Sequence, residues 1–225
     1  MTPLPIAHRG FWWPELNHQN LPRAFEAASK AGYGLELDVR SLSGEKIVIK
    51  HGPGEGVCMA LTADNIAPLF TAPLLAWNVK DERGGTLLLG FLAQNGLAEK
   101  SFLFDFELVE PHLVQRLMGK GVTLAGRASD RPDEALEDVL HANWLQAVWL
   151  DAFEQDWITA DTIRAVHAAG KAAYVVSPEL HGRPLDLALW TAWREAEGIA
   201  TDFPHLLAAL QGGGPLEPVD PWWGP

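Results

Sequence analysis

The feature that most constrains the fold is a regular alternation of short apolar, β-prone segments with longer helix-like segments. We predict strands at residues 4–10, 34–40, 74–80, 102–108, 122–128, 147–153, 172–180 and 198–204, with a hairpin partner at 46–52 after the second strand. Helix-like segments include 21–32, 112–121, 159–170 and 184–198. Eight β/α units in one run predict a parallel sheet closed into a (β/α)8 TIM barrel. A doubly wound open sheet is the structural alternative.

The chain length allows one large domain or two small ones, because 225 residues can bury a sizeable core either way. The β/α pattern continues without a linker or a low-complexity block. We therefore predict a single barrel domain over residues 1–210. Residues 211–225 are rich in Gly and Pro and are predicted to form a C-terminal tail.

Composition limits the partners and the compartment. The formal charge of −12 argues against a nucleic-acid partner but is compatible with a phosphate ester in a small, locally basic pocket. A single cysteine, Cys58, excludes an intrachain disulfide and suits a reducing compartment. The first ten residues carry no signal-peptide pattern, and no segment approaches the ~20 apolar residues of a membrane helix. We expect a cytoplasmic protein.

Ionisable residues lie repeatedly where the predicted strands end. A TIM barrel places its catalytic groups at the C-terminal ends of the strands, so these residues are predicted to share one rim. They are His8, Arg9, Glu36, Asp38, His51, Lys80, Asp105, Glu107, Asp151, Glu154, Glu179, His181 and Asp202.

Glu36 and Asp38 raise a specific problem of charge. Residues two apart on a strand point to the same side, so two carboxylates would lie together on a buried strand. Such a pair needs compensation, and a bound divalent cation is the simplest candidate. The alternative is a buried ion-pair network in which Arg9 and Lys80 neutralise both carboxylates.

Four stretches resemble the glycerophosphodiester phosphodiesterases, within the phospholipase C-like phosphodiesterase superfamily. They are "IAHRG", "QNLPRAFEAASKAGYGLELDVR", the "HG" at residues 51–52 and "GIATDFP". The resemblance extends from Ile6 to Pro204, and the first 52 residues are its most specific part. It implies the same barrel fold and an enzyme of lipid metabolism that takes a small-molecule phosphodiester.

The resemblance also implies site residues. His8 and His51 match the two histidines that serve as general acid and base, and Arg9 matches the arginine that neutralises the phosphate. Lys80 matches the lysine of the third-strand motif. Phosphodiester cleavage builds charge on the non-bridging oxygens, which cationic side chains and a metal ion stabilise.

The implied metal site departs from the family pattern. Glu36 and Asp38 match two carboxylate ligands, but Asn78 stands where the family has a third, and Gly52 replaces an Asp after the second histidine. We expect Asn78 to offer a carbonyl oxygen and Asp105 or Glu107 to supply the missing carboxylate. An oxygen-rich site of this kind favours Mg²⁺ or Ca²⁺.

"SPELHGR", residues 177–183, follows a strand with a cluster of polar groups. We expect Glu179 and His181 to contact an anionic or hydroxylated part of the substrate. Trp12 is expected to stack on a sugar or glycerol group, with Trp13, Trp77 and Trp190 as further candidates. We expect Asp151, Glu154 and Asp202 to be helix caps or solvated turn residues.

These observations favour metal-assisted hydrolysis of a glycerophosphodiester or a related polyol phosphodiester by two histidines. Two alternatives stay open. Gly52 and Asn78 are compatible with a protein that binds a phosphorylated ligand without cleaving it. A lyase that gives a cyclic phosphate would use the same histidines, His8 and His51.

Overall fold

A computed structural model describes residues 2–13, 18–52, 59–60, 67–105 and 121–213. The strands are β1 (Leu4–Ala7), β2 (Gly34–Leu42), β3 (Lys46–Ile49), β4 (Met59–Ala60), β5 (Leu75–Val79), β6 (Ser101–Phe104), β7 (Thr123–Ala128), β8 (Ala147–Leu150), β9 (Ala172–Val176) and β10 (Gly198–Thr201). The α-helices are α1 (Pro22–Lys30), α2 (Ala67–Thr71), α3 (Glu82–Gln94), α6 (Leu136–His141), α7 (Ala160–Ala168), α8 (Leu187–Ala192) and α9 (Pro204–Gly212). Two short 3-10 turns, η2 (Ala98–Lys100) and η3 (Pro178–His181), precede β6 and follow β9.

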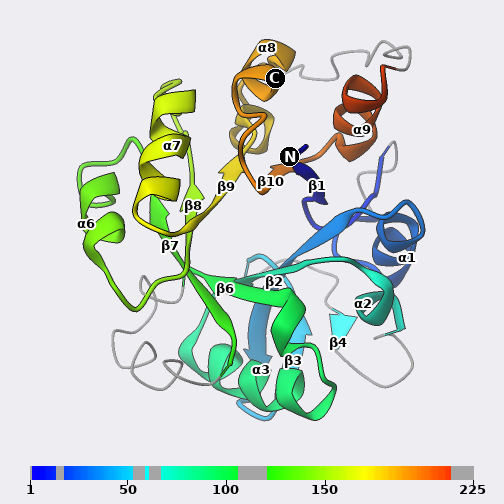
Figure 1. The fold of residues 1–225 in the computed structure, drawn as a ribbon. Coiled ribbons are helices and arrows are strands. Elements are labelled where there is room, and N and C mark those ends of the chain that lie inside the picture. The colour runs from blue at the N-terminus through cyan, green and yellow to red at the C-terminus, as the bar shows by residue number, and fades with distance from the viewer. Residues whose placement is uncertain (1, 14–17, 53–58, 61–66, 106–120, 214–225) are drawn as a thin grey trace.

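Eight parallel strands close into a barrel with helices outside them (Figure 1). The order around the barrel is β1, β2, β5, β6, β7, β8, β9 and β10, and β10 pairs with β1 to complete the ring. The closing pair is in register from Leu4 opposite Gly198 to Ala7 opposite Thr201. The prediction of a TIM barrel is therefore confirmed, and the open-sheet alternative is wrong.

The predicted hairpin insertion is also present. β3 pairs antiparallel with the second half of β2, from Val39 opposite Ile49 to Leu42 opposite Lys46. β4 adds a third antiparallel strand at the outer edge of β3. β3 therefore runs from the C-terminal end of β2 back to the level of Val39, and His51 follows two residues after it.

Side chains of the barrel strands alternate between two apolar layers, as the strand pleat requires. The smaller layer joins residues from seven strands, and in a closed barrel these fill the interior: Ile6, Ala76, Phe102, Phe104, Ala125, Ala147, Trp149, Val176 and Ala200. The larger layer lies between strands and helices and includes Phe25, Leu35, Leu37, Trp77 and Leu88. Because both faces of each strand are covered, most strand residues are apolar.

The β2–β5 register places the carboxylates of β2 among these interior positions. Glu36 lies opposite Ala76, and Asp38 lies opposite Asn78. Ala76 belongs to the interior layer, so Glu36, Asp38 and Asn78 also face the inside of the barrel. Leu37 and Trp77 alternate with them and pack against the helices.

Some predicted boundaries differ from those observed. α8 ends at Ala192, well before the predicted end at 198, because the chain turns into β10 at Gly198. α9 extends to Gly212, beyond the predicted barrel limit at 210. Three predicted features lie outside the described residues: Glu107, the predicted helix at 112–121 except for its last residue, and residues 214–225 of the predicted tail.

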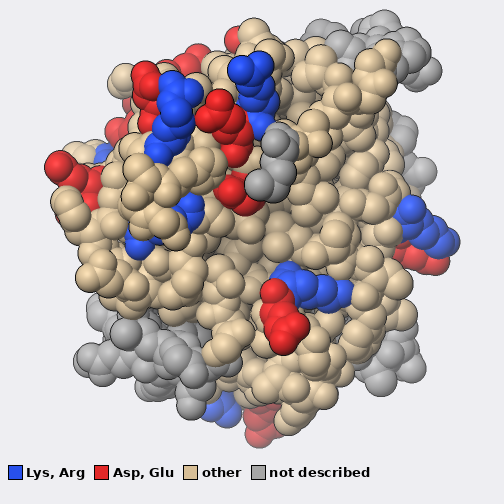
Figure 2. Space-filling view, viewed as in Figure 1, with Lys and Arg blue, Asp and Glu red and all other residues tan. Residues whose placement is uncertain are grey.

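Among the described residues, no helix has the length and apolar character needed to cross a bilayer. On the face shown in Figure 2, Lys and Arg side chains lie beside Asp and Glu side chains rather than in a separate patch. The described part of that face therefore offers no broad surface of one sign to a polyanion.

Candidate active site

The turn after β1 carries the first two candidate residues. Arg9 has a φ of 56° and Gly10 a φ of 88°, so two consecutive residues adopt the left-handed region. A Cβ at Gly10 would lie 2.8 Å from Cβ of Ala24, at the helix behind it. Only glycine fits there without displacing α1, and the tight turn directs His8 and Arg9 over the barrel mouth.

His8 is paired with Asp202, which follows β10. The His8 Nδ1 atom lies 2.7 Å from Asp202 Oδ1, and the His8 backbone N–H donates to the carbonyl of Thr201. Burial by itself lowers the pKa of His8, but the negative charge and hydrogen bond of Asp202 outweigh it and raise that pKa above 6.5. The expectation that Asp202 caps α9 is wrong, because its carboxylate orients this imidazole.

Asp38 is enclosed by cationic side chains. Its Oδ2 atom lies 3.1 Å from Arg9 Nε and its Oδ1 atom 3.4 Å from Lys80 Nζ, while the side chain is 1% exposed. The Asn20 amide also donates to Oδ2 at 3.4 Å. Although burial would raise the pKa of Asp38, Lys80 and Arg9 hold it below its usual value. Asp38 is thus ionised at neutral pH.

Glu36 differs from its neighbour. It is 2% exposed, and Oε2 accepts the Arg9 backbone N–H at 3.3 Å. Burial, followed by the negative charge of Asp38, raises the pKa of Glu36 to about 7 despite the nearby His8, Arg9 and Lys80. The ion-pair alternative therefore describes Asp38 in this structure but leaves Glu36 only partly compensated.

The oxygen atoms near Asp38 are of the kind that bind a divalent cation. Asn78 Oδ1 and Asn20 Oδ1 are buried acceptors to which no described group donates a hydrogen bond, and both residues adjoin Asp38. Together with Glu36 they give an oxygen-rich set. Within the described residues, however, no three His, Cys, Asp or Glu side chains are grouped as a metal centre would need.

Asp105 was expected to complete that centre, and the structure places it elsewhere. It follows β6, is buried, and pairs with Arg127 of β7, whereas Lys80 Nζ is 4.0 Å from its Oδ2 atom. Asp105 does not line the cavity into which Glu36 and Asp38 face. Its nearest charged partner is thus Arg127.

A cavity of about 320 Å³ opens between the strand ends. One side contains His8, Arg9, Glu36, Asp38, His51, Asn78 and Lys80, which the sequence predicted as site residues. His51 is positioned by its own carbonyl, which accepts a hydrogen bond from Arg40 Nε at 2.7 Å. Residues from β1, β2, β5 and the hairpin thus meet, although up to 72 positions separate them in the sequence.

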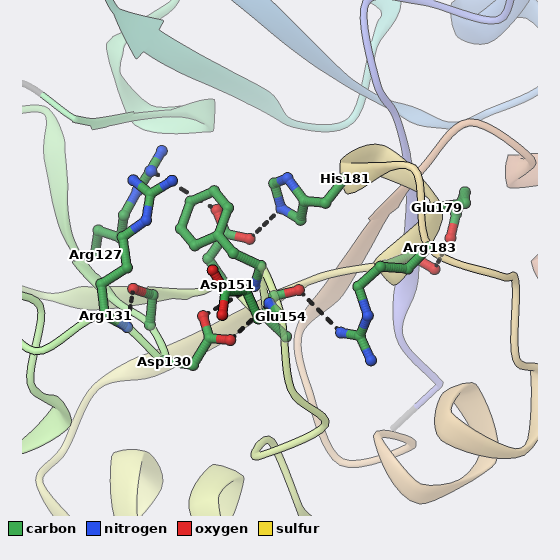
Figure 3. A network of polar contacts seen from close by, with 12 residues as sticks. Arg127, Asp130, Arg131, Asp151, Glu154, Glu179, His181 and Arg183 are labelled. Atoms are coloured by element: carbon green, nitrogen blue, oxygen red, sulfur yellow. Dashed lines mark hydrogen bonds and ion pairs between the residues drawn. The ribbon is translucent and has the colours of Figure 1, made fainter. Parts of the chain in front are cut away.

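The opposite side of the same cavity contains Arg127, Asp151 and His181, from β7, β8 and η3. Figure 3 shows Asp151 between Arg127 and His181. His181 Nε2 is hydrogen-bonded to Asp151 Oδ1, and Arg127 reaches Asp151 Oδ2 at 3.8 Å. Asp151 was expected to be a helix cap or a solvated turn residue, and it is instead buried within this cluster. Glu154, three residues on, is exposed as expected.

Arg127 is a charged cavity residue that the sequence did not lead us to predict. It is the fifth residue of β7, where the predicted strand reads "VTLAGRA", and its charge interrupts an otherwise apolar strand. A charged residue near the C-terminal end of a buried barrel strand was the available signal.

Two predicted substrate contacts do not reach the cavity. Glu179 is buried behind it and accepts hydrogen bonds from the hydroxyls of Ser177 and Thr201 and from the Asp202 backbone N–H. Trp12 is also buried and donates through Nε1 to the His8 carbonyl at 3.0 Å. Both residues support the turns that carry His8 and Asp202.

The other predicted tryptophans are absent from the cavity lining as well, and a different one is present. Trp77 and Trp190 donate to serine hydroxyls in the core, and Trp13 packs on Phe203. Trp149 of β8 lines the cavity, stacked on Phe104 with ring centroids 4.1 Å apart.

The chain matches no protein-family model and no curated protein. Its structure is similar to solved barrels at low sequence identity. A protein from Galdieria sulphuraria, provisionally assigned as a glycerophosphodiester phosphodiesterase, has 15% identity and a TM-score of 0.72, over 94% of this chain and 98% of that one. A glycerophosphodiester phosphodiesterase from Agrobacterium tumefaciens has 16% identity and a TM-score of 0.66, over 93% and 100%.

Tryptophan synthase, which belongs to a different class of enzyme, matches with a lower TM-score. The tryptophan synthase complex from Pyrococcus furiosus has 12% identity and a TM-score of 0.54, over 95% of this chain and 91% of the matched chain. Identities in this range establish architecture, and a shared barrel leaves the chemistry to the individual site. The chain therefore has the (β/α)8 fold, and among these solved structures it is more similar to the phosphodiesterases than to tryptophan synthase.

Proposed function

We propose that this chain is a divergent glycerophosphodiester phosphodiesterase that hydrolyses a small-molecule phosphodiester. One observation carries the proposal. His8, held by Asp202, shares a single cavity with His51, Arg9 and Lys80. The motif resemblance and the likeness to solved phosphodiesterases support the same reading.

The two histidines divide the proton transfers. The raised pKa of His8 favours its imidazolium form near neutral pH, so His8 is suited to protonate the leaving alkoxide as the P–O bond breaks. His51 then accepts the proton of the attacking water as the new P–O bond forms. His8 loses one proton and His51 gains one, and the products are a phosphomonoester and an alcohol.

Arg9 and Lys80 bind the phosphodiester anion. Both side chains are largely buried and both contact Asp38, so their positive groups are held at fixed positions. A substrate phosphate would share these donors with Asp38 and gain charge-assisted hydrogen bonds. Such preorganised donors stabilise the extra charge that develops on the non-bridging oxygens in the transition state.

A divalent cation would be held by Glu36, Asp38 and the Asn78 carbonyl oxygen. When bound, it would supply further positive charge beside the non-bridging oxygens. Hard oxygen donors suit Mg²⁺ or Ca²⁺. Binding would also favour the ionised form of Glu36, whose pKa of about 7 leaves it partly protonated here.

A second candidate function is binding without cleavage. It is favoured by the state of Asp38, whose two oxygens already face Arg9 and Lys80. In that case the cationic pair would retain a phosphate ester, and the carboxylates would only position the pair. A lyase that forms a cyclic phosphate is distinguished by its product.

The test is turnover of a panel of glycerophosphodiesters by chelator-treated protein, with and without Mg²⁺, Ca²⁺ or Mn²⁺. We expect cation-dependent release of the alcohol, and phosphorus NMR of the product separates a monoester from a cyclic phosphate. His8→Ala should reduce kcat by roughly 10²-fold or more. His141→Ala is the matched control, since His141 is exposed at the end of α6.

The outcomes separate the candidates. A cyclic product identifies the lyase. Absence of turnover with every cation, combined with measurable binding of glycerol phosphate, identifies the binder. Equal turnover by His8→Ala and wild type would contradict the assignment of His8, whichever product forms.

A further inference from the structure

The side of the cavity that the proposed hydrolysis does not use is built as a second polar cluster. Arg127, Asp151 and His181 belong to three consecutive barrel units, β7, β8 and β9 with its η3 turn. All three line the cavity that also contains His8 and His51. For a phosphodiester bound at Arg9 and Lys80, this cluster is a polar surface in the same cavity that is available to one of the two alcohol groups.

We propose that Arg127, Asp151 and His181 bind the alcohol group of the substrate, and that this alcohol is a neutral polyhydroxyl group. The inference rests on the proposed function, because it assumes that the phosphate lies at the opposite side. It assigns a substrate class that the motifs leave open.

The charges in this cluster are balanced against one another, which disfavours a charged alcohol. Arg127 is placed between Asp105 and Asp151, and Asp151 is shared between Arg127 and His181. An anionic group would find the Arg127 charge already offset by two carboxylates. A cationic group would find Asp151 already paired with two nitrogen donors.

The aromatic residues do not form a cage for an ammonium group either. The Arg131 guanidinium lies 3.6 Å from the centroid of Phe153, and the Arg127 guanidinium lies 5.5 Å from it. Trp149 is stacked on Phe104, so one face of each ring is covered. A quaternary ammonium needs open ring faces on several sides, whereas here Arg131 covers a face of Phe153, and Trp149 and Phe104 cover a face of each other.

Hydroxyl groups suit the cluster because each can donate and accept. Asp151 and His181 present an acceptor and an imidazole, and Arg127 presents planar N–H donors from the neighbouring strand. Trp149 and Phe104 offer an apolar wall to the C–H face of a sugar or cyclitol ring. At about 320 Å³, the cavity is near the small end for ligand sites, which suits one compact headgroup.

The experiment compares kcat/KM for glycerophosphoinositol and glycerophosphoglycerol with kcat/KM for glycerophosphocholine and glycerophosphoethanolamine. Wild type should prefer the first pair by at least about tenfold. His181→Gln and Asp151→Asn should reduce kcat/KM for the polyol diesters about tenfold or more and change it for the ammonium diesters less than about threefold. His181→Gln is the safer variant for folding, because the His181 side chain is 20% exposed whereas that of Asp151 is 3% exposed.

His167→Gln is the matched control. His167 also pairs with a carboxylate, Glu197, at 3.2 Å, but it lies on α7 and not at the cavity. His167→Gln should leave kcat/KM unchanged for the polyol diesters and for the ammonium diesters. A wild-type preference for the ammonium diesters, or an equal loss for all substrates in His181→Gln, would overturn the inference while leaving the hydrolase proposal intact.

A binding measurement separates the two proposals if no hydrolysis occurs. Ligand-detected NMR would follow free myo-inositol with wild type, His181→Gln and His167→Gln. Binding that is lost only in His181→Gln would support the alcohol subsite even when the proposed hydrolysis has failed. No binding, or equal binding by all three proteins, would overturn the subsite.

Discussion

The Nδ1 atom of His8 and the Oδ1 atom of Asp202 lie 2.7 Å apart, at the ends of the first and last strands of the barrel. This contact fixes the orientation of the imidazole and leaves the opposite ring nitrogen, Nε2, for the substrate. Because the carboxylate favours the protonated ring, the pair also sets the pH range in which His8 can donate a proton.

Asp202→Asn tests this pairing directly. Removing the negative charge should lower the pKa of His8, and the limb of the pH–rate profile that depends on protonated His8 should move to lower pH. Proton NMR titration of the His8 ring would report the same shift without substrate. Asp186→Asn is a suitable control, because Asp186 caps α8 and is absent from the cavity lining. An unchanged His8 titration would contradict the role of Asp202.

Glu36→Gln should change how stability depends on pH. Folding raises the pKa of Glu36 from 4.5 to about 7, so the folded state binds more protons between these values and loses stability as pH rises through them. A shift of this size corresponds to a loss on the order of 3 kcal/mol. In Glu36→Gln that loss should be absent, so the variant gains on wild type as pH rises.

The measurement for Glu36→Gln is urea unfolding at pH 5 and pH 8 in the presence of EDTA. Asp38 affects stability in a different pH range. Because its pKa is lowered, ionised Asp38 stabilises the fold above about pH 4, and this contribution is lost only on further acidification. Parallel stability curves for Glu36→Gln and wild type would show that Glu36 carries no such shift.

Asn78→Glu tests the proposed cation site. Asn78 Oδ1 is buried and accepts no hydrogen bond from a described group, and Asn78 lies opposite Asp38 in the β2–β5 pairing. A third carboxylate there should tighten Mg²⁺ or Ca²⁺ binding by about tenfold or more, because oxygen ligands with added charge raise affinity. Calorimetric titration of both metals would measure this. Equal or weaker binding would place the cation, if one binds, away from Asn78.

Gly10→Ala tests whether the turn after β1 depends on glycine. Gly10 and Gly32 both have positive φ, but only Gly10 would bring a new Cβ within 2.8 Å of Ala24. Gly10→Ala should therefore destabilise the protein by about 2 kcal/mol more than Gly32→Ala, since both share the backbone strain. Urea unfolding of the two variants gives the comparison. Equal losses would show that the contact with Ala24 relaxes freely.

The eightfold alternation was sufficient to predict the barrel, because strand and helix periods are local properties of the sequence. The same logic placed Glu36 and Asp38 on one face, and the β2–β5 register confirms that placement. Pairings between distant strands are not local. Nothing near Asp202 in the sequence indicates His8, and nothing near Asp151 indicates Arg127 or His181.

The placement of Glu179 shows the same limit in another form. Its position after β9 was compatible with a substrate contact, yet its side chain turns inward to the hydroxyls of Ser177 and Thr201. Burial raises the pKa of Glu179, and neighbouring hydrogen bonds act against that shift. Whether a strand-end carboxylate faces the cavity or the core depends on packing that the sequence pattern does not encode.

The closure of the barrel has a consequence for folding. His8 and Asp202 are 194 residues apart, and they meet only when β10 pairs with β1. Loops of that length close slowly compared with contacts between neighbouring units. An intermediate with an unpaired terminal strand would have most of its secondary structure but no oriented imidazole. Under the proposed function, in which His8 transfers a proton, recovery of activity during refolding should therefore lag behind recovery of the helical signal.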